Sequence, residues 1–122
     1  WTYQTATWRA ANNSATIRIS VVRGLNEDRM RVQYNCQSVP GVASDASIGI
    51  GLDATTTPTG LTAYSNAVSY ITFFQALYTA FPGLGYHFLS ALEFLATTTN
   101  AATYYSNAGA HLQVGLIGEG YA

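Results

Sequence analysis

Hydrophobic and polar residues alternate in two runs near the start of the sequence, SATIRISVVRG and RMRVQYN. In the first run Ile17 and Ile19 share one side of an extended chain, and Arg18 and Ser20 share the other. A period of two is typical of a strand with one buried face. The polar stretch GLNED separates the two runs. The pattern therefore predicts an antiparallel hairpin over residues 15–34, with its arginines on the solvent-exposed face.

Further alternating runs follow, SIGIGLD at residues 47–53 and HLQVGLIGEG near the end. Gly49 and Gly51 remove the side chains from one face of the first of these runs, which predicts a close approach of backbone there. Clusters of glycine, proline, asparagine and threonine separate the runs. Strand-like runs that are separated by such clusters, at intervals of roughly ten to fifteen residues, are typical of an all-β sandwich or barrel.

Residues 67–96 are apolar on both faces, so periodicity alone does not decide between helix and strand. Pro82-Gly83 divides the segment, and polar residues interrupt it. A membrane-spanning helix needs about twenty predominantly apolar residues, which disfavours insertion into a bilayer. We therefore expect strands buried on both sides, with one face toward a second sheet and the other toward a neighbouring subunit.

Charged residues make up 9% of the 122-residue chain and hydrophobic residues 48%. Ordinary soluble domains carry about a quarter charged residues. A monomer with so little surface charge is expected to be sticky, which predicts that a partner subunit covers much of its surface. The length predicts one domain, residues 1–122, with a single core.

The sequence contains no lysine, and all five arginines lie within its first 31 residues. The net charge of −1 argues against nucleic-acid binding, which needs a row of positive charge. The exposed face of the predicted hairpin is a sufficient explanation for most of these residues, and pairing with carboxylates at an interface is an alternative. They are Arg9, Arg18, Arg23, Arg29 and Arg31.

Cys36 is the only cysteine, so an intrachain disulfide and a multi-cysteine metal site are both excluded. A single cysteine fits assembly in a reducing cytosol. The sequence contains no G-x-S-x-G, phosphate-binding loop, dinucleotide fingerprint or H-E-x-x-H motif. We therefore expect neither an enzyme nor a bound cofactor.

Glu93 lies within a hydrophobic stretch, and a buried carboxylate needs a partner. An arginine of this or a neighbouring subunit, or His87, could supply one. We expect a structural role, an inter-subunit tether, rather than a catalytic acid. Tyr86 and Phe88 are expected at the same interface or in the core.

The two histidines, His87 and His111, suggest two alternatives. Three copies of one histidine could meet on a threefold axis and bind a metal ion. A histidine that is hydrogen-bonded inside a sheet or on its rim is the simpler interpretation, and we prefer it. Asp45 and Asp53 flank a loop and strand and could bind calcium, although their spacing matches no calcium loop. No metal is therefore predicted.

Exposed tyrosines could stack on sugar rings, although tyrosine also serves as an interface anchor. Loops on a rigid sandwich commonly carry binding residues, so three loops are candidates for ligand contact: residues 38–46, 53–62 and 100–109. The candidate ligand-facing residues are Asp45, Tyr64, Tyr104, Tyr105 and, near the C-terminus, Tyr121.

An ordered set of motifs spans most of the chain: ASIGIGLD, PGLGYHFLSALEF and LQVGLIGEG. With these features the sequence resembles a family of small C-terminal head domains at the ends of bacteriophage tail fibres and related virion appendages. The family pattern has a Pro-Gly-Leu-Gly turn, a YHYL strand with an acidic residue, a threonine-rich stretch, a turn and a short final strand. The matching segments are Pro82–Gly85, Tyr86–Leu89 with Glu93, Thr97–Thr99, Asn107–Gly109 and Leu112–Gly118, and Ala91 departs from an aromatic position.

The resemblance implies an antiparallel jelly-roll sandwich, similar to the heads of tumour-necrosis-factor and C1q, that assembles as a homotrimer. It implies a virion structural protein, assembled in the host cytoplasm, that contacts other virion proteins and attaches to the host surface, where a glycan is a possible ligand. The alternatives are a capsid-decoration or fibre-trimerisation domain without a ligand, and a small carbohydrate-binding module.

Overall fold

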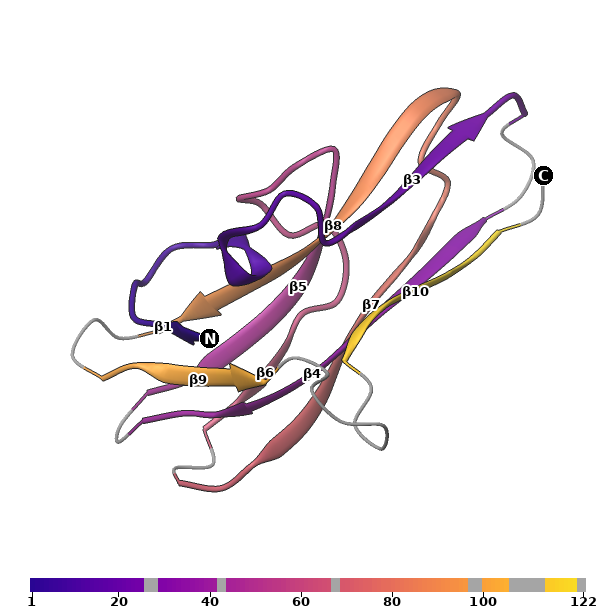
Figure 1. Ribbon diagram of the computed structural model, residues 1–122. Helices are drawn as coiled ribbons and strands as arrows, with labels where there is room; N and C mark the ends of the chain where they lie inside the picture. Colours follow the sequence, from indigo (N-terminus) through magenta and orange to yellow (C-terminus); the bar gives the residue numbers. More distant parts are fainter. Residues whose placement is uncertain (26–28, 42–43, 67–68, 97–99, 106–113, 121–122) are drawn as a thin grey trace.

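A computed structural model of the chain shows two antiparallel β-sheets that face each other (Figure 1). All regular structure in the described residues is β-strand, apart from one short 3₁₀ helix, η1 (Ala11–Asn13). The all-β, sandwich-like prediction is therefore confirmed. The structure describes residues 1–25, 29–41, 44–66, 69–96, 100–105 and 114–120.

Sheet A is built around the long strand β4. Strand β7 runs along one side of β4, while β9 and β10 pair with successive parts of its other side, and β1 pairs with β9. The strands of sheet A are β1 (Thr2–Tyr3), β4 (Met30–Val39), β7 (Thr72–Ala80), β9 (Ala102–Tyr105) and β10 (Gly115–Glu119).

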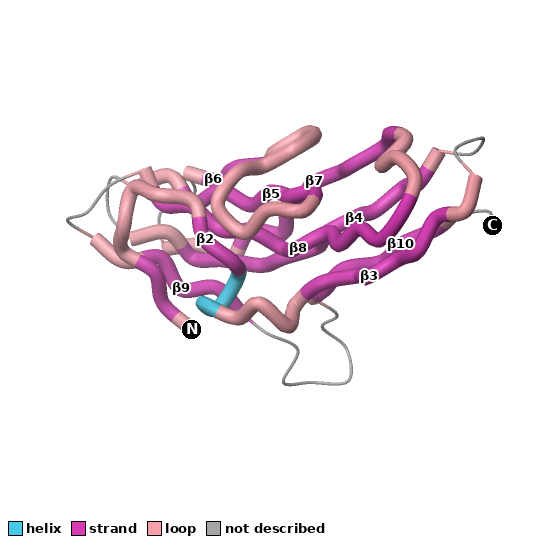
Figure 2. The backbone as a smooth tube through the Cα atoms, turned by 90° about the horizontal axis from the view of Figure 1, so that it is seen from above, coloured by secondary structure: helices cyan, strands magenta, loops and turns pink. Residues whose placement is uncertain are grey.

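Sheet B is built around β8. Strand β5 pairs with one side of β8, and β2 and β3 pair with successive parts of the other side, while β6 pairs with β5 (Figure 2). The strands of sheet B are β2 (Arg9–Ala10), β3 (Arg18–Arg23), β5 (Ala46–Leu52), β6 (Ala63–Ser65) and β8 (Gly85–Leu95).

The predicted hairpin over residues 15–34 is wrong, although both of its strands exist. Strand β3 pairs with β8 in sheet B, and β4 belongs to sheet A. Each strand has one face toward the common core, so both show the same alternation, and alternation does not specify a partner. The arginines are accordingly divided: Arg18 is exposed on sheet B and Arg31 on sheet A.

The predicted strand at residues 47–53 is confirmed as β5, and so is the close approach at its glycines. A Cβ atom on Gly49 would lie 3.0 Å from Cβ of Pro58 and 3.2 Å from the Trp8 ring. A Cβ atom on Gly51 would lie 2.9 Å from the carbonyl oxygen of Thr57. The glycines therefore allow the segment after β5 to fold back against that strand.

Strands, not a helix, occupy the ambiguous segment, as β7 and β8, with Pro82 and Gly83 in the turn between them. The second half of β8 is buried on both faces. Its outer face is covered by the chain's own N-terminal segment, where the Trp8 ring lies 5.2 Å from that of Phe94. No neighbouring subunit is needed to cover this half. No helix in the described ranges is long and apolar enough to cross a membrane.

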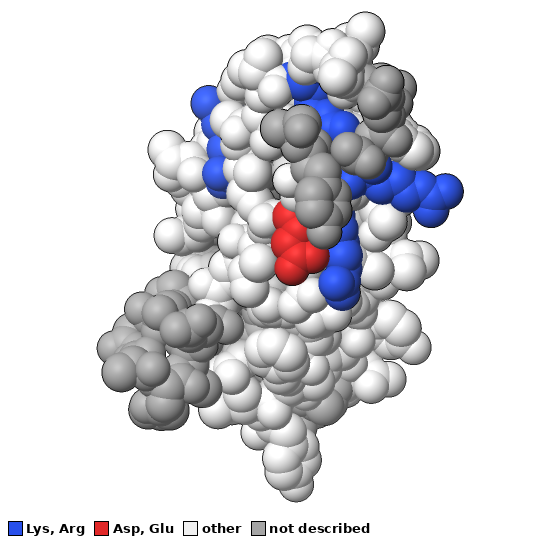
Figure 3. Space-filling view, turned by 90° about the vertical axis from the view of Figure 1, so that its right-hand side faces the viewer, with Lys and Arg blue, Asp and Glu red and all other residues white. Residues whose placement is uncertain are grey.

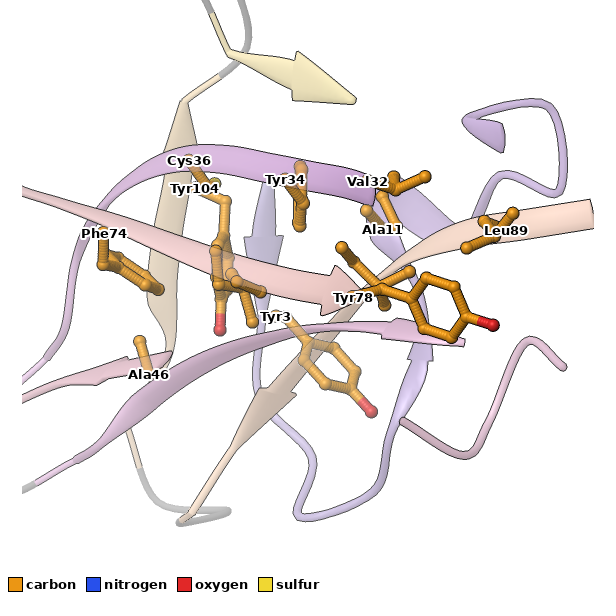
Figure 4. Close-up of a cluster of buried hydrophobic side chains, with 14 of the residues drawn as sticks. Tyr3, Ala11, Val32, Tyr34, Cys36, Ala46, Phe74, Tyr78, Leu89 and Tyr104 are labelled. Atoms are coloured by element: carbon orange, nitrogen blue, oxygen red, sulfur yellow. The ribbon is translucent and has the colours of Figure 1, made fainter. Parts of the chain in front are cut away.

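The core lies between the two sheets and is lined by both (Figure 4). Inward side chains of β4, β5, β7, β8 and β9 form it, and they include tyrosines as well as aliphatic residues. Burying large side chains of this kind contributes about 1.5–3 kcal/mol each. The largest fully buried apolar side chains are Tyr34, Tyr104, Ile48, Ile50, Leu89, Leu92 and Leu95.

Candidate functional site

Glu93 is completely buried on the core-facing side of β8. Its partner is Arg9, which stands opposite in β2, with the guanidinium Nε 2.7 Å from Glu93 Oε1. The Trp1 indole N–H donates a hydrogen bond to Glu93 Oε2. The carboxylate is therefore paired within its own chain, and neither a neighbouring subunit nor His87 supplies the partner.

Aromatic rings enclose this ion pair. The Arg9 guanidinium lies over the Tyr3 ring, 3.8 Å from its centroid, and the Trp1 ring stacks on Tyr104 with centroids 6.0 Å apart. Together Trp1, Tyr3, Arg9, Glu93 and Tyr104 form what we call the Glu93 cluster. A buried charge persists only when it is paired and hydrogen-bonded, and this cluster meets both conditions. This arrangement indicates that the Glu93 cluster has a structural role.

Burial also decides the ionisation of the groups around this cluster. It raises the pKa of the Tyr34 and Tyr104 hydroxyls well above the usual value, and the nearby Glu93 charge adds to both shifts. Burial raises the pKa of the Cys36 thiol to about 11. The thiolate is the reactive form of cysteine, so Cys36 is protonated and unreactive at neutral pH.

A second polar pair ties the end of β5 to β8. The Asp53 carboxylate contacts Nδ1 of His87 at 2.7 Å and accepts a hydrogen bond from the backbone N–H of Phe88 at 2.9 Å. These two hydrogen bonds, the one with His87 first, lower the pKa of Asp53. Asp53 also adopts the left-handed conformation, with φ of 51°. His87 is thus a hydrogen-bonded rim histidine.

The calcium hypothesis is wrong, because Asp45 and Asp53 lie at opposite ends of β5. Within the described ranges no three histidine, cysteine, aspartate or glutamate residues are grouped closely enough to hold a metal ion. His111, which the axial-metal alternative also names, lies outside the described residues.

The candidate tyrosines lie on different faces of their strands, some toward the core and some toward solvent. Tyr104 is completely buried, and its hydroxyl donates to the carbonyl oxygen of Phe94 at 2.8 Å, so its prediction as a ligand-facing residue is wrong. Alternation along β9 turns Tyr104 inward and Tyr105 outward, and the predicted loop 100–109 contains this strand. Tyr64 is exposed at 68%.

Asp45 is exposed beside β5, in the part of the loop 38–46 that precedes it. Tyr121, a further candidate, lies outside the described residues, as do two segments that match the phage-head pattern: Thr97–Thr99 and Asn107–Gly109.

Tyr86 and Phe88 lie on the outer face of β8, away from the core. Tyr86 is 56% exposed, and its hydroxyl lies 3.1 Å from that of Ser20. The half-buried ring of Phe88 lies under Arg18, at 5.2 Å. Exposed apolar residues continue from here to the end of the sandwich. We call this set the apolar tip: Val22, Leu25, Phe81, Leu84 and Tyr86.

Arginines gather at this end of the molecule, around an acidic group (Figure 3). Arg29 lies 5.6 Å from the centroid of the Phe81 ring, and Arg31 faces Glu119 across β4 and β10. Arg29 and Arg31 therefore bring positive charge to the apolar tip, whereas Arg9 is paired with Glu93 elsewhere in the sandwich.

The outer face of sheet A carries a row of amide side chains that our sequence interpretation did not single out, and the central one, Asn35, is itself buried at 9% exposed. Side chains of Gln33, Asn35 and Gln37 point outward from β4, because Tyr34 and Cys36 between them point into the core. Asn35 Oδ1 accepts hydrogen bonds from the amides of Gln33 at 3.0 Å and Gln75 at 2.8 Å.

Outward residues of the neighbouring strands flank these amides and are mainly apolar. The spacing of Gln33, Asn35 and Gln37 by two was the available sequence signal, but it does not show which strands lie beside β4. We call the whole set the amide face: Gln33, Asn35, Gln37, Phe73, Gln75, Leu77, Tyr105 and Ile117.

Comparisons with protein-family models, with curated proteins and with solved structures found no match. The similarity to phage head domains therefore depends on the motifs of the sequence alone, and the function remains to be proposed from the structure.

Proposed function

We propose that the chain is the head domain of a phage tail fibre or related virion appendage, and that it attaches the virion to the host surface as a homotrimer. One observation carries the proposal: at least twelve large hydrophobic side chains are exposed on a chain with 9% charged residues. Large exposed apolar patches mark interaction sites. They are Val22, Leu25, Leu61, Tyr64, Tyr70, Ile71, Phe73, Phe81, Leu84, Tyr86, Tyr105 and Ile117.

Trimer formation accounts for these exposed hydrophobic side chains in two ways. Self-association buries part of it, as expected for a closed, symmetric oligomer. The remainder is presented in three copies, so that three weak contacts with a cell surface act together through avidity. The jelly-roll strand order that the resemblance implies for this chain is part of the proposal, and the arrangement in two antiparallel sheets supports it.

The first test is the mass of the purified chain in solution, measured by light scattering. We expect three times the mass of the 13.1 kDa chain. A stable monomer over the concentration range of the measurement contradicts the trimeric head.

The second test is attachment of the fluorescently labelled protein to a panel of bacterial cells. Attachment by a trimer supports the proposal. A trimer that attaches to none of them supports the decoration or trimerisation alternative. A monomer that binds sugars supports the carbohydrate-binding module, for which the amide face is the specific structural support.

A further inference from the structure

We propose that the amide face binds a neutral glycan chain, with Phe73 and Tyr105 as stacking residues and Gln37 as the hydrogen-bonding residue between them. This inference rests on the proposed attachment function and names the ligand class and the surface. It places the ligand on the flat side of sheet A rather than on the loops at the ends of the sandwich.

Strand register places the three residues in one row. Gln37 of β4 stands opposite Tyr105 of β9 on one side and opposite Phe73 of β7 on the other. All three point away from the core, because their chain neighbours Phe74 and Tyr104 are buried between the sheets.

This row has the spacing of a sugar-binding platform. Neighbouring strands are about 4.8 Å apart, so the two aromatic residues are separated by roughly 10 Å, twice that spacing. This separation is close to the length of a disaccharide unit in an extended hexose chain. Each ring can therefore stack on one sugar of the same chain.

The side chains of the row match both the C–H groups and the hydroxyl groups of a sugar. Phe73 is 55% exposed and Tyr105 37%, so both offer an aromatic surface to the C–H groups of a pyranose ring. The Gln37 side-chain amide makes no hydrogen bond within the described part of the chain. An amide both donates and accepts, which suits sugar hydroxyls.

The neighbouring amides are ordered beside this platform. Because Asn35 Oδ1 accepts hydrogen bonds from Gln33 and Gln75, the amides of β4 and β7 are held beside the row. Fixed side chains lose little conformational freedom when a ligand binds. A shallow depression lined by Gly60, Leu61, Leu77 and Thr79 lies at the β7 edge of the same face.

Charge selects the class of glycan. None of the eight residues of the amide face carries a formal charge. The next row toward the apolar tip contains Arg31 and Glu119, which face each other and have opposite signs. A strongly acidic polymer finds no matching row of positive charge here, so the surface suits a neutral glycan.

The test is isothermal titration of the purified chain with cellohexaose, maltohexaose and chitohexaose, and with the acidic hexamer of galacturonic acid. We expect binding of at least one neutral hexasaccharide and little or none of the acidic one. Phe73→Ala and Tyr105→Ala should each weaken binding by about tenfold or more, since each removes one stacking surface. Gln37→Leu, which keeps the bulk but not the amide, should weaken it as well.

Arg18→Ala is the control, because Arg18 is an exposed strand residue on the outer face of sheet B, away from the amide face. It should bind the neutral hexasaccharide as the wild type does. Equal losses in this control and in Tyr105→Ala, or binding of the acidic hexamer alone, would overturn the proposal. So would the absence of binding to all three neutral hexasaccharides.

Light scattering and cell attachment on the same variants separate this inference from the proposed function. If Phe73→Ala and Tyr105→Ala remain trimeric and attach as well as the wild type, the amide face is not the ligand site and the attachment function stands. If the wild type is monomeric or attaches to no cell, the proposed function fails, whatever the titration with sugars shows.

Discussion

Arg9 and Glu93 stand directly opposite each other in β2 and β8, and their side chains form an ion pair of 2.7 Å at the edge of the core. The Glu93 side chain is completely inaccessible to solvent, whereas 28% of the Arg9 side chain is exposed. The pair thus joins the short N-terminal strand to the central strand of sheet B. Its loss affects folding before it affects any surface function.

Arg9→Leu leaves a buried carboxylate whose remaining donor, within the described residues, is the Trp1 indole. We expect a loss of about 3–5 kcal/mol in the free energy of unfolding, because removing one partner of a buried pair leaves an uncompensated charge. Urea denaturation followed by tryptophan fluorescence measures this loss. The double variant Arg9→Leu/Glu93→Leu should recover most of it, and a double variant whose losses simply add would contradict the pairing.

Glu93→Lys places a second positive charge beside Arg9 in the core, so we expect it to prevent folding. Circular dichroism should show the loss of β-structure. A Glu93→Lys protein that is folded but no longer oligomeric would instead show that Glu93 acts at a subunit interface.

Acid should weaken the link between Asp53 and His87. Hydrogen bonds from His87 and the Phe88 N–H hold the pKa of Asp53 below its ordinary value of 3.8 in the folded protein. The folded state therefore favours the ionised carboxylate. This contribution to stability is complete above pH 3.8 and is lost as the pH falls through the folded-state pKa.

Asp53→Asn removes this titration and keeps a residue that tolerates the left-handed backbone. We expect the difference in melting temperature between the wild type and Asp53→Asn to shrink as the pH is lowered from 6 to about 3. A difference that is constant over this range would exclude Asp53 as a source of acid sensitivity.

Gly51→Ala should destabilise the protein, because the new Cβ atom collides with the backbone carbonyl oxygens of Ala54 and Thr57. We expect a loss of about 1–3 kcal/mol, typical of overpacking. Gly24→Ala is the control, since a Cβ atom there meets nothing within 4 Å. Thermal denaturation of the two variants should separate them clearly, and equal stabilities would contradict the close approach at β5.

Cys36 should report on unfolding. Its thiol is completely buried and has a pKa of about 11, so a thiol reagent such as dithionitrobenzoate should react slowly with the folded protein at pH 8. In urea the reaction should become fast and should follow the unfolding transition. Rapid labelling of the folded protein would show that the core around β4 is open.

The sequence allowed several strands to be predicted but not their partners. Alternation located β3, β4 and β5, because each has one face toward the core and each keeps a period of two. The separation of β3 and β4 into different sheets was not predictable, since the short connection between them is compatible both with a hairpin and with a crossing from one sheet to the other.

Prediction of the candidate site from the sequence was limited in the same way. That Glu93 needs a partner was predictable from its apolar surroundings, but Arg9 lies 84 positions earlier in a strand of two residues, too short to show a period. The amide face depends on a register that joins β4 to β7 and β9. Such contacts between distant segments leave no local pattern in the sequence.

The N-terminal strands find all of their partners late in the chain: β1 pairs with β9, and both β2 and β3 pair with β8. During synthesis, the first 23 residues therefore leave the ribosome long before the strands that hold them exist. Non-local pairing of this kind slows folding and exposes unpaired strand edges. The chain thus completes its sandwich only after β8 and β9 have been synthesised, and a truncated product that stops before β8 has no sheet to receive its N-terminal strands.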